Sequence, residues 1–251
     1  MPDLTSPAQP AARLETRDVR RVYRDVHAVE GVDLKVHAGE ILALVGLNGA
    51  GKTTLMRLLL AMVRPSGGTV QVLGHDAAQC TAAQWARVGH LIETPFAYPE
   101  LTVHENVVVA GRLHGLSAAD AGPAATDVLR RLALESFAQR RSRTLSLGNR
   151  QRLGLACAMV HRPDVLVLDE PTNALDPRGV LVVRAALRDA AQRSAAVLVS
   201  SHHLDEVARV ADRIAVMHRG RVIGTLDPAG ADLERAFFAM VYDAEPQEVT
   251  P

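Results

Sequence analysis

One stretch of the sequence combines glycine, lysine and threonine residues at a spacing that can bind phosphate. Residues 46–54 read GLNGAGKTT and fit the pattern G-x-x-x-x-G-K-[ST]. The stretch follows an apolar run at 41–45, which predicts a buried strand, and it leads into residues 52–63, which predict a helix. Glycines at such a junction let backbone N–H groups turn inward, beside the positive end of the helix dipole. We therefore predict a phosphate-binding loop whose contacts come from Gly46, Asn48, Gly49, Ala50, Gly51, Lys52, Thr53 and Thr54.

Lys52 is the residue of this loop that can neutralise phosphate charge. The chain has 28 lysine and arginine residues together, and only two of them, Lys35 and Lys52, are lysines. A compact ammonium on a flexible stem suits a point contact to the β- and γ-phosphates, and the Thr53 hydroxyl can ligate Mg²⁺. The alternative is a glycine-rich turn that binds nothing, but a rare lysine at this position favours a nucleotide site.

Two carboxylates follow a second apolar run. Residues 165–168 predict a buried strand, and Asp169 and Glu170 come directly after it. Because ligands of parallel α/β sheets bind at the carboxyl ends of the strands, we expect Asp169 to reach the Mg²⁺ that Thr53 also touches. Glu170 is then placed to orient and deprotonate a water in line with the γ-phosphate. Taken alone, the pair would fit solvated acids at a strand end better; after a phosphate loop, the metal-site interpretation is favoured.

The overall composition is ordinary for a globular chain and carries no strong charge preference. Of the 251 residues, 48% are hydrophobic, 22% are charged and 3% are aromatic, and the formal net charge is +0. A neutral chain with few aromatic residues is a poor candidate for nucleic-acid binding, and no apolar run approaches the ~20 residues that span a bilayer. Cys80 and Cys157 fit no metal-binding spacing and are expected to be reduced core residues.

Helical and strand patterns alternate along the chain, which predicts an α/β fold with a parallel sheet. A capping box of Thr102 and Glu105 marks one helix start, and Ser117 with Asp120 marks another more weakly. Strands are expected at residues 17–23, 32–36, 41–45, 69–72, 88–92, 165–168, 196–200, 213–217 and 221–225. Helices are expected at residues 52–63, 82–87, 103–113, 118–134, 149–160, 178–192, 203–211 and 231–241.

The order of these elements also predicts how the chain is divided. From about residue 95 to residue 161 the strand patterns stop and helix follows helix, so we expect a helical subdomain inserted between strands of the core sheet. Residues 14–241 as a whole are expected to form a single domain. Residues 1–13 predict a flexible leader, and residues 242–251 predict a loose C-terminal tail.

Three further segments, together with the phosphate loop and the acidic strand, resemble the ATP-binding-cassette (ABC) ATPases. Residues 145–152, LSLGNRQR, are similar to the signature motif of that family. Residues 173–176, NALD, resemble its D-loop, and residues 201–206, SHHLDE, resemble its switch-histidine segment. The motif order and spacing agree from about Leu14 to Met240. The resemblance implies a P-loop NTPase fold of the ABC ATPase type, with a RecA-like parallel core sheet, an N-terminal antiparallel β subdomain and an inserted α-helical subdomain.

The resemblance implies that the site is shared between two chains. In the family, two cassettes sandwich two ATP molecules head to tail, so Ser146 and Gly148 would cap the γ-phosphate held by a second copy. Asp176 of the D-loop would be a further nucleotide contact. The residue types suit this role, because Ser146 can cap a helix from Asn149 whose positive end then faces an anion. A lone Ser-x-Gly would more often be only a helix cap, so the assignment depends on the neighbouring motifs.

The resemblance also implies the catalytic and adenine contacts. His202 would contact the γ-phosphate and hold Glu170 and the water in place, so Glu170, His202 and Lys52 are the expected catalytic residues. His203 is the weaker candidate, since the family's histidine directly follows the serine pair. Tyr23 would stack on adenine. Without the family pattern, these histidines and this tyrosine would more often be ordinary surface or packing residues.

Three residues depart from the usual family pattern. Leu147 replaces a glycine and Asn149 replaces a glutamine in the signature, while the groups that meet phosphate remain. Glu93 stands where the family normally has a glutamine that ligates Mg²⁺ and links to the membrane subunit. The segment around Glu93 looks like the exporters of bacitracin and lantibiotics, which carry glutamate there. We expect Glu93 to keep the metal-sensing and coupling role; the alternative is that it points to solvent.

We therefore predict the ATP-binding and ATP-hydrolysing subunit of an ABC transporter, with ATP and Mg²⁺ as cofactors. Binding of Mg·ATP would close a dimer of cassettes, expected to be a homodimer, and hydrolysis would reopen it. A polytopic membrane permease subunit would hold the chain at the cytoplasmic face of the cell membrane. The branch resemblance favours export of an antimicrobial peptide or drug.

Two other functions are weighed against this one. A soluble ABC ATPase of translation or DNA repair is disfavoured, because such proteins carry two cassettes or a long coiled-coil insertion and because a neutral chain does not favour nucleic acid. A regulatory cassette without catalysis is disfavoured because Lys52, Asp169, Glu170 and His202 are all present.

Overall fold

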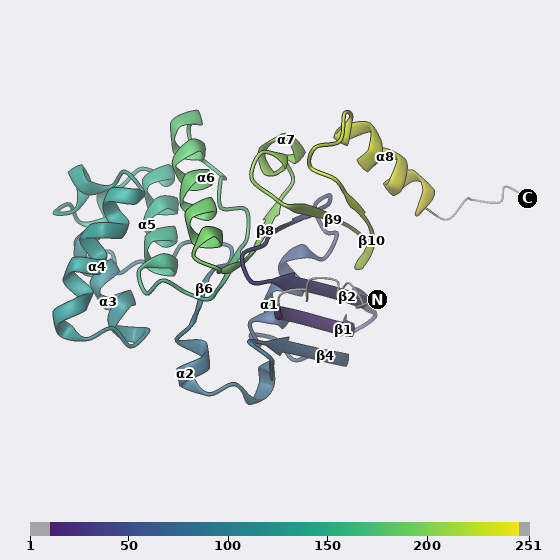
Figure 1. The fold of residues 1–251 in the computed structure, drawn as a ribbon, viewed down its shortest axis with the longest axis horizontal. Coiled ribbons are helices and arrows are strands. Elements are labelled where there is room, and N and C mark those ends of the chain that lie inside the picture. Colours follow the sequence, from purple (N-terminus) through teal and green to yellow (C-terminus); the bar gives the residue numbers. More distant parts are fainter. Residues whose placement is uncertain (1–10, 246–251) are drawn as a thin grey trace, which may run out of the picture.

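The computed structural model describes residues 11–245 and contains two β-sheets, with most helices beside the larger one (Figure 1). The larger sheet has the strand order β10-β9-β3-β8-β7-β6 and is parallel except for β10 at one edge. The smaller sheet has the order β2-β1-β4-β5 and is antiparallel. The strands are β1 (Ala12–Tyr23), β2 (Val26–His37), β3 (Ile41–Val45), β4 (Gly67–Val72), β5 (His75–Asp76), β6 (Val88–Leu91), β7 (Val165–Leu168), β8 (Ala196–Ser201), β9 (Arg213–His218) and β10 (Arg221–Leu226).

The helices gather mainly on one side of the larger sheet. Between residues 95 and 161 the described chain contains α3, α4 and α5 but no strand, and these three helices pack together away from the smaller sheet (Figure 1). Within residues 11–245, no helix has both the length and the apolar character that crossing a membrane requires. The helices are α1 (Lys52–Leu59), α2 (Ala82–Trp85), α3 (Val103–Leu113), α4 (Ala118–Arg131), α5 (Leu147–Met159), α6 (Pro177–Gln192), α7 (Leu204–Ala208) and α8 (Leu233–Asp243).

The larger sheet separates two hydrophobic cores, because alternate residues of each strand face opposite sides. In β3, Ala43 belongs to the core that also contains residues of α3, α4, α5 and α6. Leu42 and Leu44 belong to the other core, with α1 and the smaller sheet. All three side chains are 0% exposed. The loop that joins β3 to α1 is therefore anchored in buried structure on both sides.

The predicted fold class is confirmed: a mainly parallel core sheet, an antiparallel N-terminal sheet and helices inserted between core strands are all present. The capping box of Thr102 and Glu105 is present with both of its hydrogen bonds. One short strand, β5, was not predicted, because two residues are too few to show alternation. The helix predicted at 52–63 ends at Leu59, since Ala61 has a φ of 52° and the chain turns away there.

Two predicted boundaries are wrong. The leader predicted at residues 1–13 includes Ala12 and Arg13, which belong to β1. Arg13 is held there by Asp164, whose Oδ1 lies 2.5 Å from the guanidinium. The tail predicted at 242–251 begins too early, because α8 continues to Asp243. The remainder of both segments, residues 1–10 and 246–251, lies outside the described residues.

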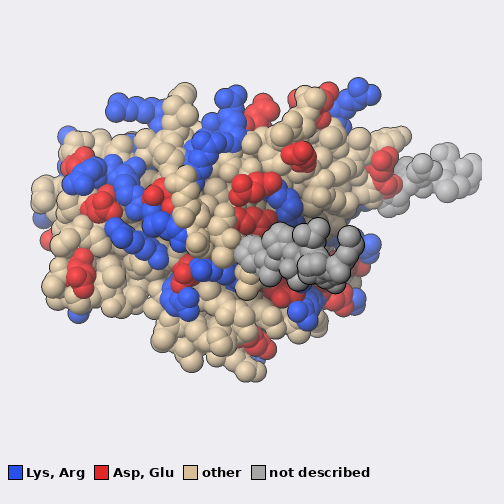
Figure 2. Space-filling model, in the orientation of Figure 1, with Lys and Arg blue, Asp and Glu red and all other residues tan. Residues whose placement is uncertain are grey.

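Acidic and basic side chains are interspersed over the face of the molecule shown in Figure 2, as the formal net charge of +0 suggests. The arginine clusters of the helical region follow this pattern. Arg141 and Arg143 both lie near Glu100, at 3.5 and 3.3 Å, and Arg130 lies 3.2 Å from Glu135. These clusters are therefore parts of mixed-charge, solvated surfaces.

Candidate active site

Close backbone contacts shape the loop between β3 and α1. A Cβ atom at Gly46 would come within 2.2 Å of the Met217 carbonyl oxygen, and one at Gly51 within 2.4 Å of the Ala28 carbonyl oxygen. Gly51 also has a φ of 106° and directly precedes α1. Only glycine fits both positions, so these two residues allow the loop to wrap closely before the helix begins.

The loop lines a cavity of about 500 Å³. Residues 48–54 form one wall, and Asp169 and Glu170, which follow β7, form another. The N-terminus of α1 opens into this region, and helix N-termini with inward-pointing N–H groups attract anions. The remaining lining residues are Val26, His27, Ala28 and Arg219.

Lys52 lines this cavity and is only 7% exposed. Its Nζ donates to the carbonyl of Gly46 at 2.7 Å and lies 3.8 Å from a carboxylate oxygen of Glu170. Burial lowers the pKa of Lys52, whereas the nearby carboxylates of Glu170 and Asp169 act in the opposite direction. The ammonium group thus lies between the loop and the acidic strand end.

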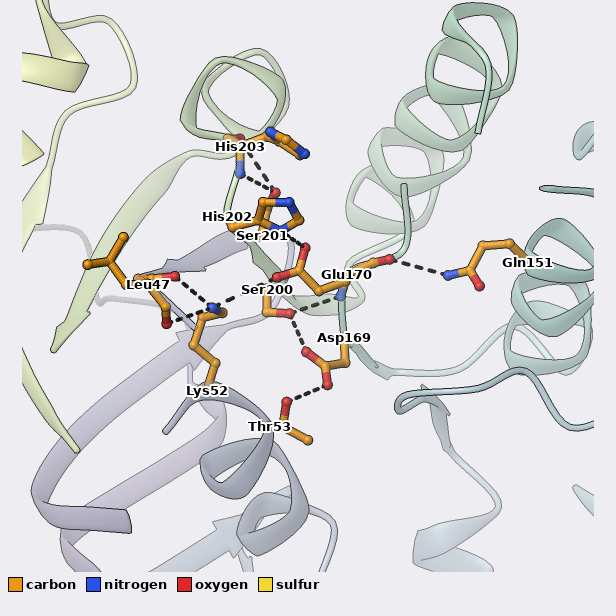
Figure 3. Close-up of polar contacts among 11 residues, drawn as sticks. Leu47, Lys52, Thr53, Gln151, Asp169, Glu170, Ser200, Ser201, His202 and His203 are labelled. Carbon is orange, nitrogen blue, oxygen red and sulfur yellow. Dashed lines mark hydrogen bonds and ion pairs between the residues drawn. The ribbon is translucent and has the colours of Figure 1, made fainter. Parts of the chain in front are cut away.

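Asp169 is tied to the loop and to a neighbouring strand at once. Thr53 Oγ1 donates to Asp169 Oδ2 at 2.7 Å, and Ser200 Oγ donates to Asp169 Oδ1 at 2.5 Å (Figure 3). Asp169 is 5% exposed and Ser200 is 0% exposed. The predicted pair of metal ligands, Thr53 and Asp169, is therefore brought together.

Glu170 and His202 form the second predicted pair. The carboxylate of Glu170 accepts a hydrogen bond from His202 Nδ1 at 2.9 Å, which requires the tautomer protonated at Nδ1. The backbone of Glu170 has a φ of 48° and is held on both sides: its N–H donates to Ser200 Oγ at 2.9 Å, and its carbonyl accepts from Gln151 Nε2 at 3.3 Å. Figure 3 shows His202 over Glu170 and the His203 ring turned away from it.

The predicted signature and D-loop residues lie at the N-termini of α5 and α6, away from the cavity. Ser146 is the N-cap of α5, where its Oγ accepts from the Asn149 N–H at 3.3 Å, which confirms the predicted cap. A Cβ at Gly148 would lie 2.8 Å from the carbonyl oxygen of Ala174, so the signature packs against the D-loop of the same chain. Asp176 caps α6 through the Gly179 N–H at 2.7 Å. None of these residues lines the cavity beside the phosphate loop.

Tyr23 lies at the end of β1 and is 37% exposed. The Arg21 guanidinium lies 4.3 Å from the centre of its ring, so an arginine already covers one side of it. Tyr23 pairs with Val26 of β2, and Val26 lines the cavity. Tyr23, the residue predicted to stack on adenine, therefore lies beside the cavity but is not one of the residues that line it.

Glu93 lies two residues after β6 and contacts neither Thr53 nor Asp169 through any described hydrogen bond. Its carboxylate instead lies 2.5 Å from the Arg57 guanidinium of α1, and its side chain is 58% exposed. The alternative that Glu93 points to solvent is met in part, because the side chain is accessible but paired with Arg57. Its metal-sensing and coupling role stays a prediction.

Six residues of the site were not predicted. Ser200 and Gln151 fix Asp169 and Glu170. The other four line the cavity: Val26, His27, Ala28 and Arg219. The motif SHHLDE begins one residue after Ser200, so the hydroxyl pattern at the end of β8 was the available signal. Arg219 enters through the turn between β9 and β10, where Gly220 N–H donates to the Ala50 carbonyl at 2.8 Å. No local pattern indicates that contact.

Comparison with known proteins agrees with this geometry. A family profile described as ABC transporter matches residues 29–173. The daunorubicin/doxorubicin resistance ATP-binding protein DrrA of Streptomyces peucetius is 40% identical over 86% of this chain and 65% of its own length. The bacitracin transport ATP-binding protein BcrA of Enterococcus faecalis is 36% identical over 84% of this chain and 68% of its own length. This chain thus spans only about two thirds of these relatives.

The fold comparison gives the same family. A solved structure described as the ATP-binding subunit of an ABC transporter has a TM-score of 0.80 at 29% identity, and the match covers 91% of this chain and 94% of that one. The profile match spans more than half of the chain and includes the phosphate loop and the acidic strand. The chain therefore belongs to the ABC transporter family, as one of its ATP-hydrolysing cassettes.

Proposed function

We propose that this cassette binds Mg·ATP beside the phosphate loop, hydrolyses it between two cassettes and drives export through a separate membrane subunit. The observation that carries the proposal is the connected polar chain from Lys52 through Glu170 to His202. It lies next to the Thr53–Asp169 hydrogen bond. Lys52 supplies a positive charge for the phosphates, Glu170 a base and His202 a group that orients it. Thr53 and Asp169 supply metal ligands, and all of these groups lie at one edge of the sheet.

Glu170 is the base in this proposal. Two groups fix the direction of its carboxylate, His202 at 2.9 Å and Lys52 at 3.8 Å. As a water attacks the γ-phosphate, Glu170 takes its proton, and Lys52 stabilises the negative charge on the phosphate oxygens. The His202 side chain is 40% exposed, so the ring edge opposite Nδ1 is available for the γ-phosphate.

The oxygen donors beside the loop fit Mg²⁺. A threonine hydroxyl and a carboxylate oxygen lie 2.7 Å apart, and Ser200 fixes the other carboxylate oxygen. Mg²⁺ is typically held by one or two carboxylates together with substrate phosphates. We place the ion at Thr53 and Asp169, where it would neutralise charge on the β- and γ-phosphates, and we propose Glu93 as a third ligand.

A second copy of the chain is proposed to complete the site. Ser146 and Leu147 are exposed at the N-terminus of α5, with Leu147 61% exposed, and the first turn of this helix contains no acidic residue. In a two-fold dimer, the same contact is made twice, so each Ser146 and Gly148 would close the partner's phosphate loop. Asp176, exposed at the start of α6, would lie at the same interface. Tyr23 would stack on the adenine with its ring face opposite Arg21.

A groove of about 390 Å³ supports a membrane partner. It lies where the segment after Glu93 meets α3 and α5, and Phe96 and Leu113 at its rim are 74% and 76% exposed. Exposed apolar side chains around a groove are typical of protein interaction sites. By the family resemblance, this segment faces the membrane subunit, so we propose that a polytopic permease docks there and holds the cassette at the cytoplasmic face of the membrane.

The cargo follows from the relatives rather than from the cassette itself. DrrA is named for resistance to daunorubicin and doxorubicin, and BcrA for bacitracin transport. Both names support an antimicrobial peptide or drug as the exported compound. Isolation from membranes together with a multi-span protein is expected; recovery only with ribosomes or DNA would contradict the transporter proposal.

A Glu170→Gln variant tests the catalytic part. Loss of the base should lower kcat by about 10²–10⁴-fold, while the groups that bind ATP remain, so ATP should trap a stable dimer. Phosphate release gives kcat, and light scattering after size exclusion gives the dimer. Glu135→Gln, in an exposed ion pair far from the cavity, is the control and should behave as the unchanged chain. Hydrolysis at full rate in Glu170→Gln would assign the base to another residue.

A further inference from the structure

Glu93 lies at the same sheet edge as the proposed metal ligand. In the parallel pairing of β6 with β7, Leu91 is opposite Leu168, and the Asp169 N–H donates to the Leu91 carbonyl at 2.8 Å. Glu93 and Glu170 therefore follow two neighbouring strands by the same number of residues. The backbone places Glu93 at the same sheet edge as the proposed metal site, while its side chain, with that of Arg57, lines the groove beside α3 and α5.

The side chain of Glu93 is directed to Arg57, with 2.5 Å between carboxylate and guanidinium. Arg57 lies four residues after Thr53 on α1, and residues at this spacing share one face of a helix. This face of α1 thus contacts two adjacent strand ends, through Thr53 to Asp169 and through Arg57 to Glu93. Glu93 also has a φ of 59°, a left-handed conformation that residues other than glycine rarely adopt, so its surroundings must hold it there.

We propose that Arg57 is a positioning residue that holds Glu93 away from the metal site, and that Glu93 exchanges Arg57 for Mg²⁺ when Mg·ATP is bound. The inference rests on the proposed function and adds that Arg57 and Mg²⁺ compete for the Glu93 carboxylate. Without the ion, a third carboxylate beside Asp169 and Glu170 is repelled by their charge, and the Arg57 guanidinium is the nearby group that neutralises it. The divalent ion reverses this preference. A glutamine at position 93 could not form the ion pair, so the exchange between Arg57 and Mg²⁺ requires the glutamate.

A permanent surface ion pair that only stabilises the loop is the competing explanation, and the two differ in one measurable quantity. If Arg57 competes with the metal, its removal must strengthen Mg²⁺ binding, and only while Glu93 is present. Because both side chains are partly exposed, at 34% and 58%, the pair is weak and the effect is modest.

The experiment titrates Mg²⁺ against the full chain with a fluorescent, non-hydrolysable ATP analogue, and it measures the Mg²⁺ concentration at half-maximal anisotropy. Arg57→Gln should lower this concentration by about two- to five-fold, and Arg57→Lys, which keeps the charge, by less. Glu93→Gln should raise it, and adding Arg57→Gln to Glu93→Gln should change nothing further. Arg130→Gln, which removes an exposed arginine from its pair with Glu135, is the matched control and should have no effect.

Three results would overturn the proposal. These are an unchanged Mg²⁺ midpoint in Arg57→Gln, the same shift in the presence and absence of Glu93, and an unchanged midpoint in Glu93→Gln. The last result would also remove Glu93 as a metal ligand. A separate measurement of analogue binding by the unchanged chain, with and without EDTA, distinguishes failure of this proposal from failure of the proposed function. If the unchanged chain does not bind the analogue under either condition, the nucleotide site itself is rejected. Melting temperatures of the variants exclude unfolding as the cause of any shift.

Discussion

The two halves of the proposed ATP site differ in how much of each is built by one chain. Around the phosphate loop, Lys52, Thr53, Asp169, Glu170 and His202 are joined by hydrogen bonds and close charge contacts. At the signature, the Ser146 hydroxyl accepts a hydrogen bond from the first turn of its own helix and from no other group within residues 11–245, and Leu147 beside it is 61% exposed. The first half is organised by contacts within one chain, whereas the second presents a helix N-terminus to solvent.

Burial explains the difference. Asp169 and Ser200 are almost fully inaccessible, and a buried polar group without a partner costs about 1–3 kcal/mol, so the fold must satisfy them internally. An exposed helix N-terminus can be satisfied by water and carries no such requirement. The signature is therefore free to be completed by another molecule, and we attribute that role to a second copy.

The largest effect is expected from mixing two variants that are each inactive alone. Lys52→Ala damages only the phosphate-loop half, and Ser146→Arg damages only the signature half, so each alone should lose hydrolysis by at least about 10²-fold. In a mixed dimer, one site combines both defects and the other is intact. An equal mixture should recover roughly a quarter of the original rate, because about half of the dimers are mixed and each has one working site.

Phosphate release as a function of mixing ratio measures this recovery. A mixture of Lys52→Ala with Lys52→Ala, Glu93→Gln serves as the control, since no arrangement of these two chains contains an intact loop. If the first mixture stays inactive, or if Ser146→Arg alone hydrolyses at the normal rate, the two halves do not belong to different chains.

Ser200→Ala tests the internal half through stability. The substitution leaves Asp169 Oδ1 and the Glu170 N–H without their hydroxyl partner, so we expect a loss of about 1–3 kcal/mol in the free energy of unfolding. Ser201→Ala, in the same strand but bonded to the backbone of His203, is the neighbouring control and should cost less. Urea unfolding gives both values. Equal costs would mean that the buried hydroxyl of Ser200 has no special role.

A third prediction concerns the loss of stability at acidic pH caused by His161, which lies two residues after the C-terminal end of α5. Burial lowers the pKa of His161 to about 3, and the charge of nearby His114, whose ring is stacked on it at 3.8 Å, acts in the same direction. The unfolded chain therefore binds more protons below about pH 6.5, so the contribution of His161 to stability is present above that pH and is lost as the pH falls towards 3. Between pH 7.5 and 5 the loss should be roughly 1–2 kcal/mol.

His161→Phe should flatten this part of the pH profile of unfolding, while His75→Gln, at an exposed position of β5, should leave it unchanged. The pKa of His90 in β6 is also lowered, chiefly by desolvation, so His90 adds in the same direction and is kept in both variants. A profile that keeps its slope in His161→Phe would show that other groups determine the response to acid.

The sequence was sufficient for the parts of the site whose geometry is local. The loop at 46–54, the acids after β7 and the cap at Ser146 depend on neighbouring residues in the chain, and each was found where predicted. The alternation of helix and strand likewise predicted the parallel sheet, with errors mainly at the ends of elements.

The contacts that were missed depend on pairing between distant strands. Ser200 reaches Asp169 because β7 and β8 pair with Leu168 opposite Val199, a register that no local pattern contains. The contact between Arg57 and Glu93 has a similar origin, since these two residues are separated by 36 positions in the sequence. The departure of Glu93 from the family pattern was visible, but its partner was not.

The most direct test of the account measures the rate of ATP hydrolysis per molecule over a wide range of protein concentration. Because each proposed site needs a second chain to complete it, the specific rate should rise with concentration and level off where light scattering shows an ATP-bound dimer. Glu170→Gln should form that dimer without turnover. A specific rate that stays constant on dilution, with no dimer trapped in Glu170→Gln, would contradict the claim that two copies build the site.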